Sequence, residues 1–196
     1  MLPEGVRIVA PVSAQEAGEA ALQLVASGRG SLQRVLGNAA QRVALFGPAL
    51  RWSHVLLAMH DQQALGFIAF KRHGVGPYAP TREDFRRVFG AAGGLWRWLA
   101  FVCIERRDRK SAFYIYGLKV VVRARRQGLA AALLDAALAR ARDAGATQAE
   151  LELRVGNEAA RRLYASRRFE PCGEVELGLA GRLLSFRRLL RMRVIL

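Results

Sequence analysis

The sequence predicts an α/β or α+β domain built on one mixed sheet, because strand-like and helix-like segments alternate along the chain. The segments HVLLAMH (54–60) and ALGFIAF (64–70) are joined by a short polar stretch and predict an antiparallel hairpin. Two strand–helix units then follow, at 112–144 and 148–169. A chain of 196 residues has the usual length of one domain with a sizeable core, so we expect a single domain over 1–196.

The first fifty residues predict one strand and two helices. Residues 7–10 are a short apolar strand candidate. Ser13 and Glu16 have the spacing of a capping box, which predicts a helix over 17–25. Apolar residues then recur at steps of three and four over 31–45, so a second helix is expected there.

Residues 81–107 predict further helix. Thr81 and Asp84 again have the spacing of a helix start, and the pair Gly93 and Gly94 marks a weak point, so we expect one broken helix or two short ones. Three interpretations fit its aromatic segment LWRWLAF: it lines an acceptor pocket, touches a membrane surface, or covers the sheet as core.

The second half of the chain predicts the best-defined elements. Residues 112–122 are rich in aromatic and β-branched side chains and predict a strand, in which Gly117 indicates a bulge or a close backbone approach. An apolar stripe then predicts a helix over 128–144. A strand is expected at 148–155 and a helix at 157–169.

The last residues predict two alternating strands, 174–180 and 189–196, paired as a hairpin across Gly181. The apolar face of this hairpin belongs either to the core or to a homodimer interface.

The chain is strongly basic, with 31 basic and 16 acidic residues and a net charge of +15. This charge favours a polyanion, an anionic cofactor or a membrane surface as partner. Nearly all the basic residues are arginines spread along the chain, however, so a codon-level preference for arginine also explains the charge without any partner.

Other features exclude several classes of protein. Cys103 and Cys172 show no CxxC spacing, so neither a disulfide framework nor a metal site is expected. The N-terminal residues do not have the pattern of a secretory signal. The longest apolar stretch falls short of the ~20 residues that a membrane span needs, so we expect a cytoplasmic protein.

The stretch RARRQGLA (123–130) predicts an anion site, because it joins the strand ending at Val122 to the helix beginning at Gly128. Unpaired backbone N–H groups and the positive end of the helix dipole meet there. Gly128 leaves room for a phosphate to approach the backbone. Neither a Walker loop nor the dinucleotide fingerprint GxGxxG is present in the sequence.

The pattern Arg125-x-x-Gly128-x-Ala130 after a strand resembles the pyrophosphate loop of the GNAT superfamily of acetyl-coenzyme A dependent N-acetyltransferases. The later run NEAARRLY (157–164), which ends in Phe169, resembles the helix that follows in that superfamily. The resemblance is close over 112–172, while residues 6–70 match only in the order of elements.

The resemblance implies a single N-acetyltransferase domain with a mostly antiparallel central sheet flanked by helices. Residues 112–172 would form the cofactor-binding core, and residues 81–107 would be an extra helical insertion. The acceptor would be a small-molecule or protein amine.

The resemblance also implies site residues for acetyl-CoA. The strand before the loop would splay from its neighbour and offer backbone groups to the pantetheine arm through Leu118, Val120 and Val122. Asn157 would hydrogen-bond the cofactor arm, and Tyr164 would face the sulfur. The diphosphate would be held by the loop residues Arg125, Arg126, Gln127, Gly128, Leu129 and Ala130.

Tyr164 has the chemistry that the reaction needs. Direct transfer from a thioester to an amine expels a thiolate, and a phenol with a pKa of ~10 stays protonated at neutral pH and can donate to the departing sulfur. The alternative is that Tyr164 is only a core aromatic on an amphipathic helix.

The chain departs from the family pattern in three places. Val122 stands where many relatives have a proline, and Arg168 stands where a glycine precedes the final phenylalanine. Tyr116 and Gly117 stand where many relatives place an acidic residue in the strand. An ammonium substrate must lose a proton before it attacks, and Glu152 in the next strand is the candidate base.

Tyr116 could pass a proton through water, whereas His54, His60 and His73 are expected to be ordinary core or surface histidines.

We therefore expect an enzyme that moves an acetyl group from acetyl-CoA directly to a primary amine. The rival interpretation is a non-catalytic module of the same fold that binds acyl-CoA, nucleic acid or a ribosome. A third is transfer of a longer acyl group, or transfer to a hydroxyl.

Overall fold

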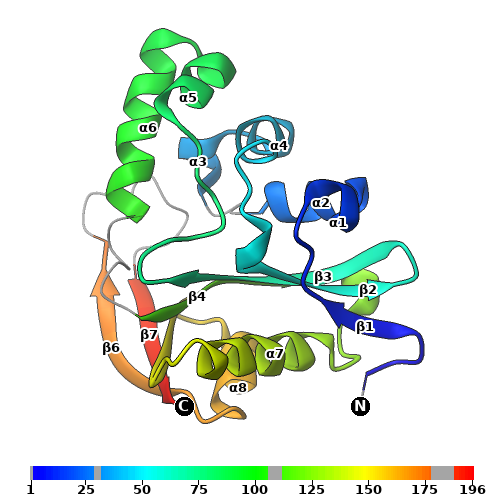
Figure 1. Cartoon of the computed structure of the whole chain (residues 1–196). Helices are drawn as coiled ribbons and strands as arrows, with labels where there is room; N and C mark the ends of the chain where they lie inside the picture. The colour runs from blue at the N-terminus through cyan, green and yellow to red at the C-terminus, as the bar shows by residue number, and fades with distance from the viewer. Residues whose placement is uncertain (1, 29–31, 106–111, 178–187) are drawn as a thin grey trace.

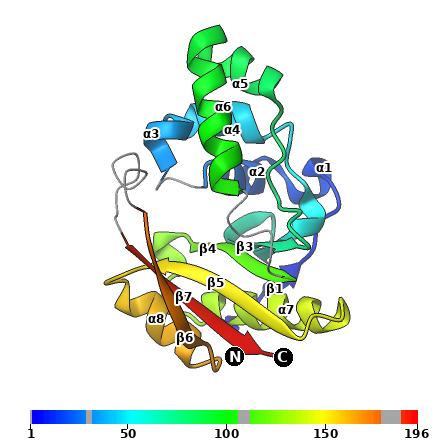
Figure 2. The same cartoon turned by 90° about the vertical axis from the view of Figure 1, so that its left-hand side faces the viewer.

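The computed structural model describes residues 2–28, 32–105, 112–177 and 188–196. They contain a seven-stranded sheet in the order β1-β2-β3-β4-β5-β7-β6 (Figures 1 and 2). Neighbouring strands are antiparallel except β4 and β5, which run parallel, so the mixed, mostly antiparallel sheet is confirmed. The strands are β1 (Val6–Val9), β2 (Val55–His60), β3 (Gln63–Arg72), β4 (Phe113–Val120), β5 (Gln148–Arg154), β6 (Glu170–Glu176) and β7 (Arg188–Ile195).

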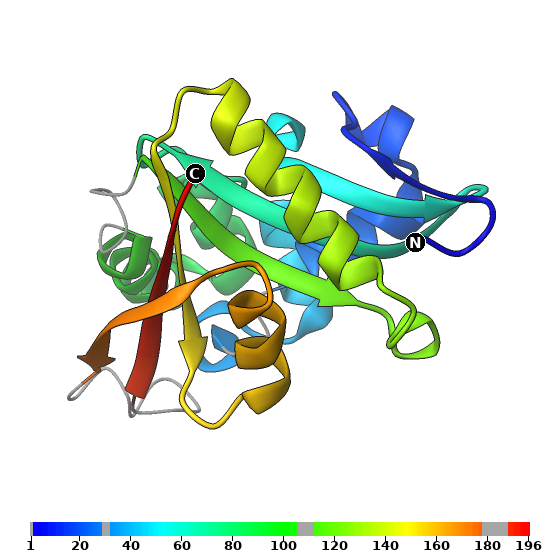
Figure 3. The same cartoon turned by 90° about the horizontal axis from the view of Figure 1, so that it is seen from below.

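Helices cover both faces of the sheet (Figures 1 and 3). The face covered by α7 (Leu129–Asp143) and α8 (Glu158–Ala165) is called the α7 face below, and the opposite face is called the α6 face. The helices on the α6 face are α1 (Ala14–Ala17), α2 (Glu19–Ala26), α3 (Gln33–Leu36), α4 (Ala39–Phe46), α5 (Arg82–Phe89) and α6 (Ala91–Glu105).

Each face of the sheet packs its own apolar core. On the α7 face, Ile115 and Leu151 of the sheet belong to one buried cluster with Leu134 of α7. On the α6 face, Phe67 of β3 is buried with Phe46 of α4. The helix pair α5 and α6 extends away from the sheet in Figure 1.

The helix expected over 17–25 is in fact divided between α1 and α2. Ser13 caps α1 by accepting a hydrogen bond from the Glu16 N–H at 3.2 Å, while the Glu16 carboxylate accepts from the Val12 N–H at 2.8 Å. The division falls at Gly18, whose φ of 80° lies in the left-handed region that glycine adopts readily.

The single helix expected over 31–45 is also wrong, because Gly37, with a φ of 76°, ends α3. Asn38 and Gln41 then form a capping box that starts α4. The apolar spacing continues across the break because Val35, Leu36 and Leu45 face the same core.

The break in the 81–107 helix falls at Gly90 rather than at Gly93 and Gly94. Thr81 and Asp84 form the expected capping box at the start of α5. Gly94 lies inside α6, where a Cβ atom would sit 2.6 Å from the Phe85 carbonyl oxygen. Its role is therefore close packing of α6 against α5.

The end of α8 is a turn in which Arg168, which stands where relatives have a glycine, adopts a left-handed conformation. Arg168 has a φ of 62°, and its N–H donates to the Ala165 carbonyl while the Phe169 N–H donates to the Tyr164 carbonyl. These two bonds form a Schellman motif, which in most proteins has glycine at this position.

The last two strands pair antiparallel, as expected. β6 begins at Glu170, earlier than the sequence pattern indicated, and the predicted turn at Gly181 lies outside the described residues. Among the described residues, no helix has the length and apolar character that crossing a membrane requires.

Candidate active site

The parallel strands β4 and β5 separate soon after they meet. Only Tyr114 and Ile115 of β4 pair with β5, opposite Glu150 and Leu151. Beyond that point β4 stays paired with β3, while β5 stays paired with β7. The sheet therefore opens between the carboxyl-terminal halves of two neighbouring strands, as the splay expected at this strand requires.

A bulge in β4 lies at the start of this opening. Ala69 of β3 pairs with Gly117 and Phe70 pairs with Ile115, so Tyr116 is the extra residue. The bulge brings Leu118 to the α7 face beside Ile115, while Tyr116 packs on the α6 face. A Cβ atom at Gly117 would meet nothing within 4 Å, so this glycine marks the bulge and not a close approach.

The loop after β4 leads into α7 through two left-handed residues, Arg126 with a φ of 65° and Gly128 with a φ of 80°. The first hydrogen bond of the helix runs from the Ala132 N–H to the Gly128 carbonyl. The N–H groups of residues 129–131 consequently have no partner within the helix. They emerge beside the open end of β4, as an anion site requires.

Side-chain contacts hold this loop in place. Arg123 donates to the Gln63 side chain at 2.8 Å and ties the loop to the β2–β3 hairpin. Arg125 Nε donates to the Val120 carbonyl at 3.3 Å, and the Gln127 amide donates to the Arg123 carbonyl at 3.3 Å. Arg126 is exposed.

The remaining residues predicted to contact the cofactor differ in exposure. Leu118 and Val120 are half-buried, Ala130 is also half-buried, and Val122 is 76% exposed. Leu129 is fully buried in the core of the α7 face, so only its backbone could contact a ligand.

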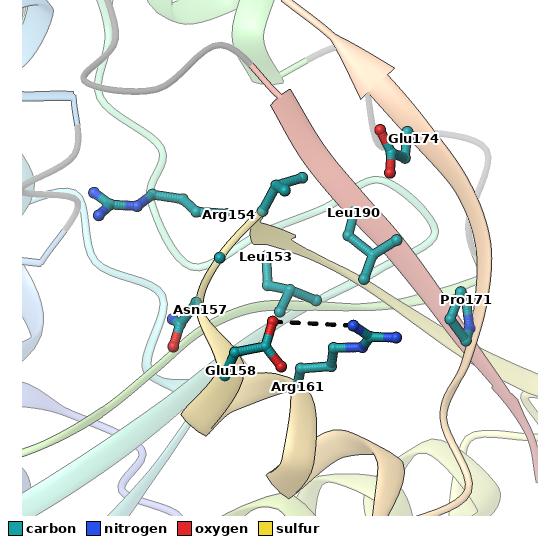
Figure 4. A pocket seen from close by; sticks show the side chains of 10 residues that line it. Leu153, Arg154, Asn157, Glu158, Arg161, Pro171, Glu174 and Leu190 are labelled. Atoms are coloured by element: carbon teal, nitrogen blue, oxygen red, sulfur yellow. Dashed lines mark ion pairs between the residues drawn. The ribbon is translucent and has the colours of Figure 1, made fainter.

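Asn157 lies at the start of α8, where its side-chain oxygen accepts from the Ala160 N–H at 3.2 Å. This cap does not use the amide nitrogen of the same side chain. Asn157 also borders a pocket of about 290 Å³ between the end of β5, α8 and the β6–β7 pair, shown in Figure 4 with the Glu158–Arg161 ion pair beside it.

Tyr164 is buried on the α7 face, with 8% of its surface exposed. Burial raises the pKa of its phenol to about 12, because the phenolate would lose its hydration. No described residue hydrogen-bonds its hydroxyl. The phenol is therefore held protonated at neutral pH, which the role of proton donor requires.

Glu152 lies on the opposite face of the sheet from Tyr164. Its neighbours Leu151 and Leu153 belong to the core of the α7 face, and β-strand alternation turns Glu152 toward the α6 face. There its carboxylate forms an ion pair with Arg191 at 2.8 Å, the residue opposite it on β7. The hydrogen bond from Arg191 to Glu152 raises the pKa of that guanidinium.

A second carboxylate near the opening was missed by sequence reasoning. Glu105, the last residue of α6, forms an ion pair with Lys71 of β3 at 2.8 Å and accepts a hydrogen bond from the Tyr116 hydroxyl. Lys71 is only 1% exposed and also lies over the Tyr116 ring, 4.5 Å from its centroid. The available signal was a lysine at the end of an otherwise apolar strand.

Metal-binding side chains and His54 were also considered in the sequence, and the structure places both as follows. The described residues hold no cluster of three metal-binding side chains. His54 is buried, and its Nδ1 lies 3.2 Å from the Phe70 carbonyl oxygen; burial lowers its pKa, as expected for a core histidine.

The model of the acetyltransferase (GNAT) family matches residues 38–169. Curated proteins gave no sequence match. Among solved structures, an acetyltransferase is 17% identical, with 96% of this chain and 98% of that chain covered and a TM-score of 0.62. Ard1 from Thermoplasma volcanium is 15% identical, with 98% of each chain covered and a TM-score of 0.57.

The polyamine N-acetyltransferase of Drosophila melanogaster, which forms N-acetylagmatine, is 12% identical. The match covers 97% of this chain and all of the Drosophila chain, with a TM-score of 0.58. At these identities the three structures establish a shared fold.

Proposed function

The chain belongs to the GNAT family of acetyltransferases, and we propose that it transfers an acetyl group from acetyl-CoA directly to a primary amine of its acceptor. The observation that carries this proposal is the opening between β4 and β5 beside the start of α7. A strand edge with free backbone groups and a helix start suit the two halves of the cofactor, the pantetheine arm and the diphosphate.

In this proposal the diphosphate lies on the N–H groups at the start of α7, with Gly128 giving it access and the arginines of the loop adding positive charge. The pantetheine arm lies along β4 and hydrogen-bonds backbone groups of Leu118, Val120 and Val122. The spare amide nitrogen of Asn157 donates to the same arm. The burial of Leu129 supports a contact through its backbone alone.

The reaction would begin when the neutral amine attacks the thioester carbonyl. The tetrahedral intermediate then collapses, the C–S bond breaks, and the thiolate takes the proton of the Tyr164 hydroxyl. The amide nitrogen loses its extra proton, which restores the Tyr164 phenol. The buried phenol is protonated at neutral pH, as a proton donor to the thiolate must be.

The acceptor is proposed to carry a carboxylate or a phosphate near its amine. The Drosophila neighbour acts on polyamines, but a net charge of +15 repels a polycation. We expect turnover of an acidic acceptor to slow markedly as salt is added, because screening removes the attraction. Turnover that is independent of salt would count against this acceptor class.

Calorimetric titration with acetyl-CoA tests the cofactor site. We expect saturable one-site binding that is lost in Gly128→Glu, which places a side chain and a negative charge where the diphosphate would lie. Gly145→Glu is the matched control, because Gly145 also has a positive φ, of 72°, but lies just beyond the opposite end of α7.

Equal loss of binding in both variants would point to damage of the helix and not of a diphosphate site. An unaltered protein that binds no acetyl-CoA, but binds nucleic acid with an affinity that falls steeply with salt, would favour the non-catalytic rival.

A further inference from the structure

The residues Lys71, Glu105 and Tyr116 form one polar cluster on the α6 face, called the Glu105 cluster below. Its members come from β3, α6 and β4. Tyr116 follows directly after the last residue of β4 that pairs with β5, so its ring stands where the two strands begin to separate. In the proposed function, this is where the acceptor amine meets the thioester.

The chemistry of the cluster is that of a proton relay. The Tyr116 hydroxyl donates to Glu105 Oε1, and the ammonium of Lys71 contacts Glu105 Oε2 at 2.8 Å. Lys71 is almost completely buried, whereas Glu105 keeps 18% of its side chain exposed. A phenol thus stands between the opening in the sheet and a carboxylate that reaches solvent.

We propose that Tyr116 and Glu105 remove the proton from the acceptor ammonium, a role that rests on the proposed acetyl transfer. The N–H bond of the ammonium breaks, and its proton passes to the Tyr116 oxygen. The Tyr116 O–H proton moves at the same time to the Glu105 carboxylate. The neutral amine keeps its electron pair for attack on the thioester, and Glu105 later releases the proton to solvent.

Lys71 holds the Glu105 carboxylate in position and favours its return to the ionised form. Its ammonium contacts Glu105, and it also lies over the Tyr116 ring, so it fixes both partners. When Glu105 is protonated, the buried ammonium loses the negative charge of the carboxylate 2.8 Å away, which favours release of the proton to solvent. Two further tyrosines lie beside the cluster: Tyr78 packs against Tyr116 with 5.6 Å between ring centroids, and Tyr114 of β4 stands opposite Lys71 of β3.

Glu152, the base expected from the sequence, is the competing candidate on the same face. Its carboxylate forms an ion pair with the guanidinium of Arg191, at 2.8 Å, and not with a member of the Glu105 cluster. The two candidates are therefore separable by single substitutions, Glu105→Gln and Glu152→Gln.

The test measures thiol release from acetyl-CoA with a panel of ethanolamine, lysine, agmatine and an alanine-initiated peptide. We expect kcat at pH 7 to fall roughly 100-fold in Glu105→Gln and in Tyr116→Phe. The deficit should shrink as the pH approaches the pKa of the amine, because solvent then supplies the neutral form. Acetyl-CoA affinity should stay unchanged, and Glu83→Gln on the exposed surface of α5 is the control carboxylate.

A structural role predicts a different result in a double variant. Glu105→Gln removes the carboxylate that forms an ion pair with the buried Lys71 and should lower the melting temperature by about 10 °C. Adding Lys71→Met removes that buried charge and should restore the melting temperature. We expect activity to stay low in the double variant, whereas recovery of activity with stability would overturn the proposal.

The outcomes also separate this proposal from the proposed function. The proposed relay alone is overturned if Glu105→Gln turns over as fast as the unaltered protein. It is also overturned if the loss of kcat in Glu105→Gln does not shrink at high pH. A fall caused by Glu152→Gln instead would move the base to β5. If the unaltered protein binds acetyl-CoA but acetylates none of the panel, the acetyl-transfer proposal fails and the relay fails with it.

Discussion

The ring of Phe169 stands edge-on to the ring of Tyr164, with 5.7 Å between their centroids. Both rings are buried, and the Phe169 N–H donates to the Tyr164 carbonyl across the turn that ends α8. The turn depends on Arg168, which holds a positive φ between them. The placement of the candidate proton donor is thus coupled to a strained backbone position four residues later.

Replacing Arg168 with glycine should stabilise the protein. A non-glycine residue in the left-handed region costs roughly 1 kcal/mol, although glycine offsets part of this gain by adding freedom to the unfolded chain. We expect Arg168→Gly to raise the free energy of unfolding by about 0.5 kcal/mol in urea denaturation. Arg168→Ala keeps the strain and should give no gain, and a gain in that variant would assign the effect to the side chain.

Asn157 is expected to serve both the fold and the cofactor. Asn157→Asp keeps the oxygen that caps α8 but removes the amide donor, so stability should hold while acetyl-CoA affinity falls about tenfold. Asn157→Ala should also lose about 1 kcal/mol of stability. Ser13→Ala removes a cap far from the site and is the control. If Asn157→Asp binds normally by calorimetry, the amide has no role.

Arg42 should matter for stability alone. Its buried guanidinium donates to the Ser27 carbonyl at 3.0 Å and to the Gly37 carbonyl at 2.6 Å, and burial lowers its pKa. We expect Arg42→Met to cost about 2 kcal/mol in urea denaturation, because two carbonyl groups lose their donor. Arg86→Ala on the surface is the control and should change the free energy of unfolding little. A comparable loss in that variant would mean that the effect of Arg42→Met does not come from its buried hydrogen bonds.

The sequence predicted elements whose signals are local. Strand composition at 112–122, the apolar stripe of 128–144 and the loop between them indicated β4, α7 and the helix start at Gly128, and the structure confirms the order and type of these elements. The capping box at Thr81 could be predicted for the same reason. Each signal lies within a few residues of the feature that it predicts.

Features that depend on distant contacts were missed or misplaced. The apolar spacing continues through Gly37 because α3 and α4 both face one core, so spacing alone could not reveal the break between the two helices. The capping box at Asn38 was the available signal for that break. The sequence pattern marks Gly94 as a weak point, but the position of Phe85 shows that this glycine serves close packing. The ion pair of Lys71 with Glu105 joins residues 34 apart, which no local pattern reports.

Tyr164→Phe should separate catalysis from binding and from folding. Phenylalanine keeps the ring that packs on Phe169, so acetyl-CoA affinity should hold while kcat falls roughly 100-fold through loss of the donor to the thiolate. With a folded-state pKa of about 12, Tyr164 stays protonated across pH 7–10. The ratio of kcat in the unaltered protein to kcat in Tyr164→Phe should therefore stay constant over that range. The ratio of kcat in the unaltered protein to kcat in Glu105→Gln should instead fall as the pH rises.

Stability gives an independent check on the Tyr164 phenol. In the unfolded chain its pKa returns to ~10, so above that pH the unfolded state ionises while the folded state does not. The contribution of Tyr164 is therefore fully present below pH 10 and is lost as the pH rises toward 12. Tyr164→Phe should lose less stability than the unaltered protein over this interval in urea denaturation. Parallel losses in the two proteins would mean that burial does not raise the pKa of the Tyr164 phenol, and would contradict the buried, protonated phenol that the structure shows.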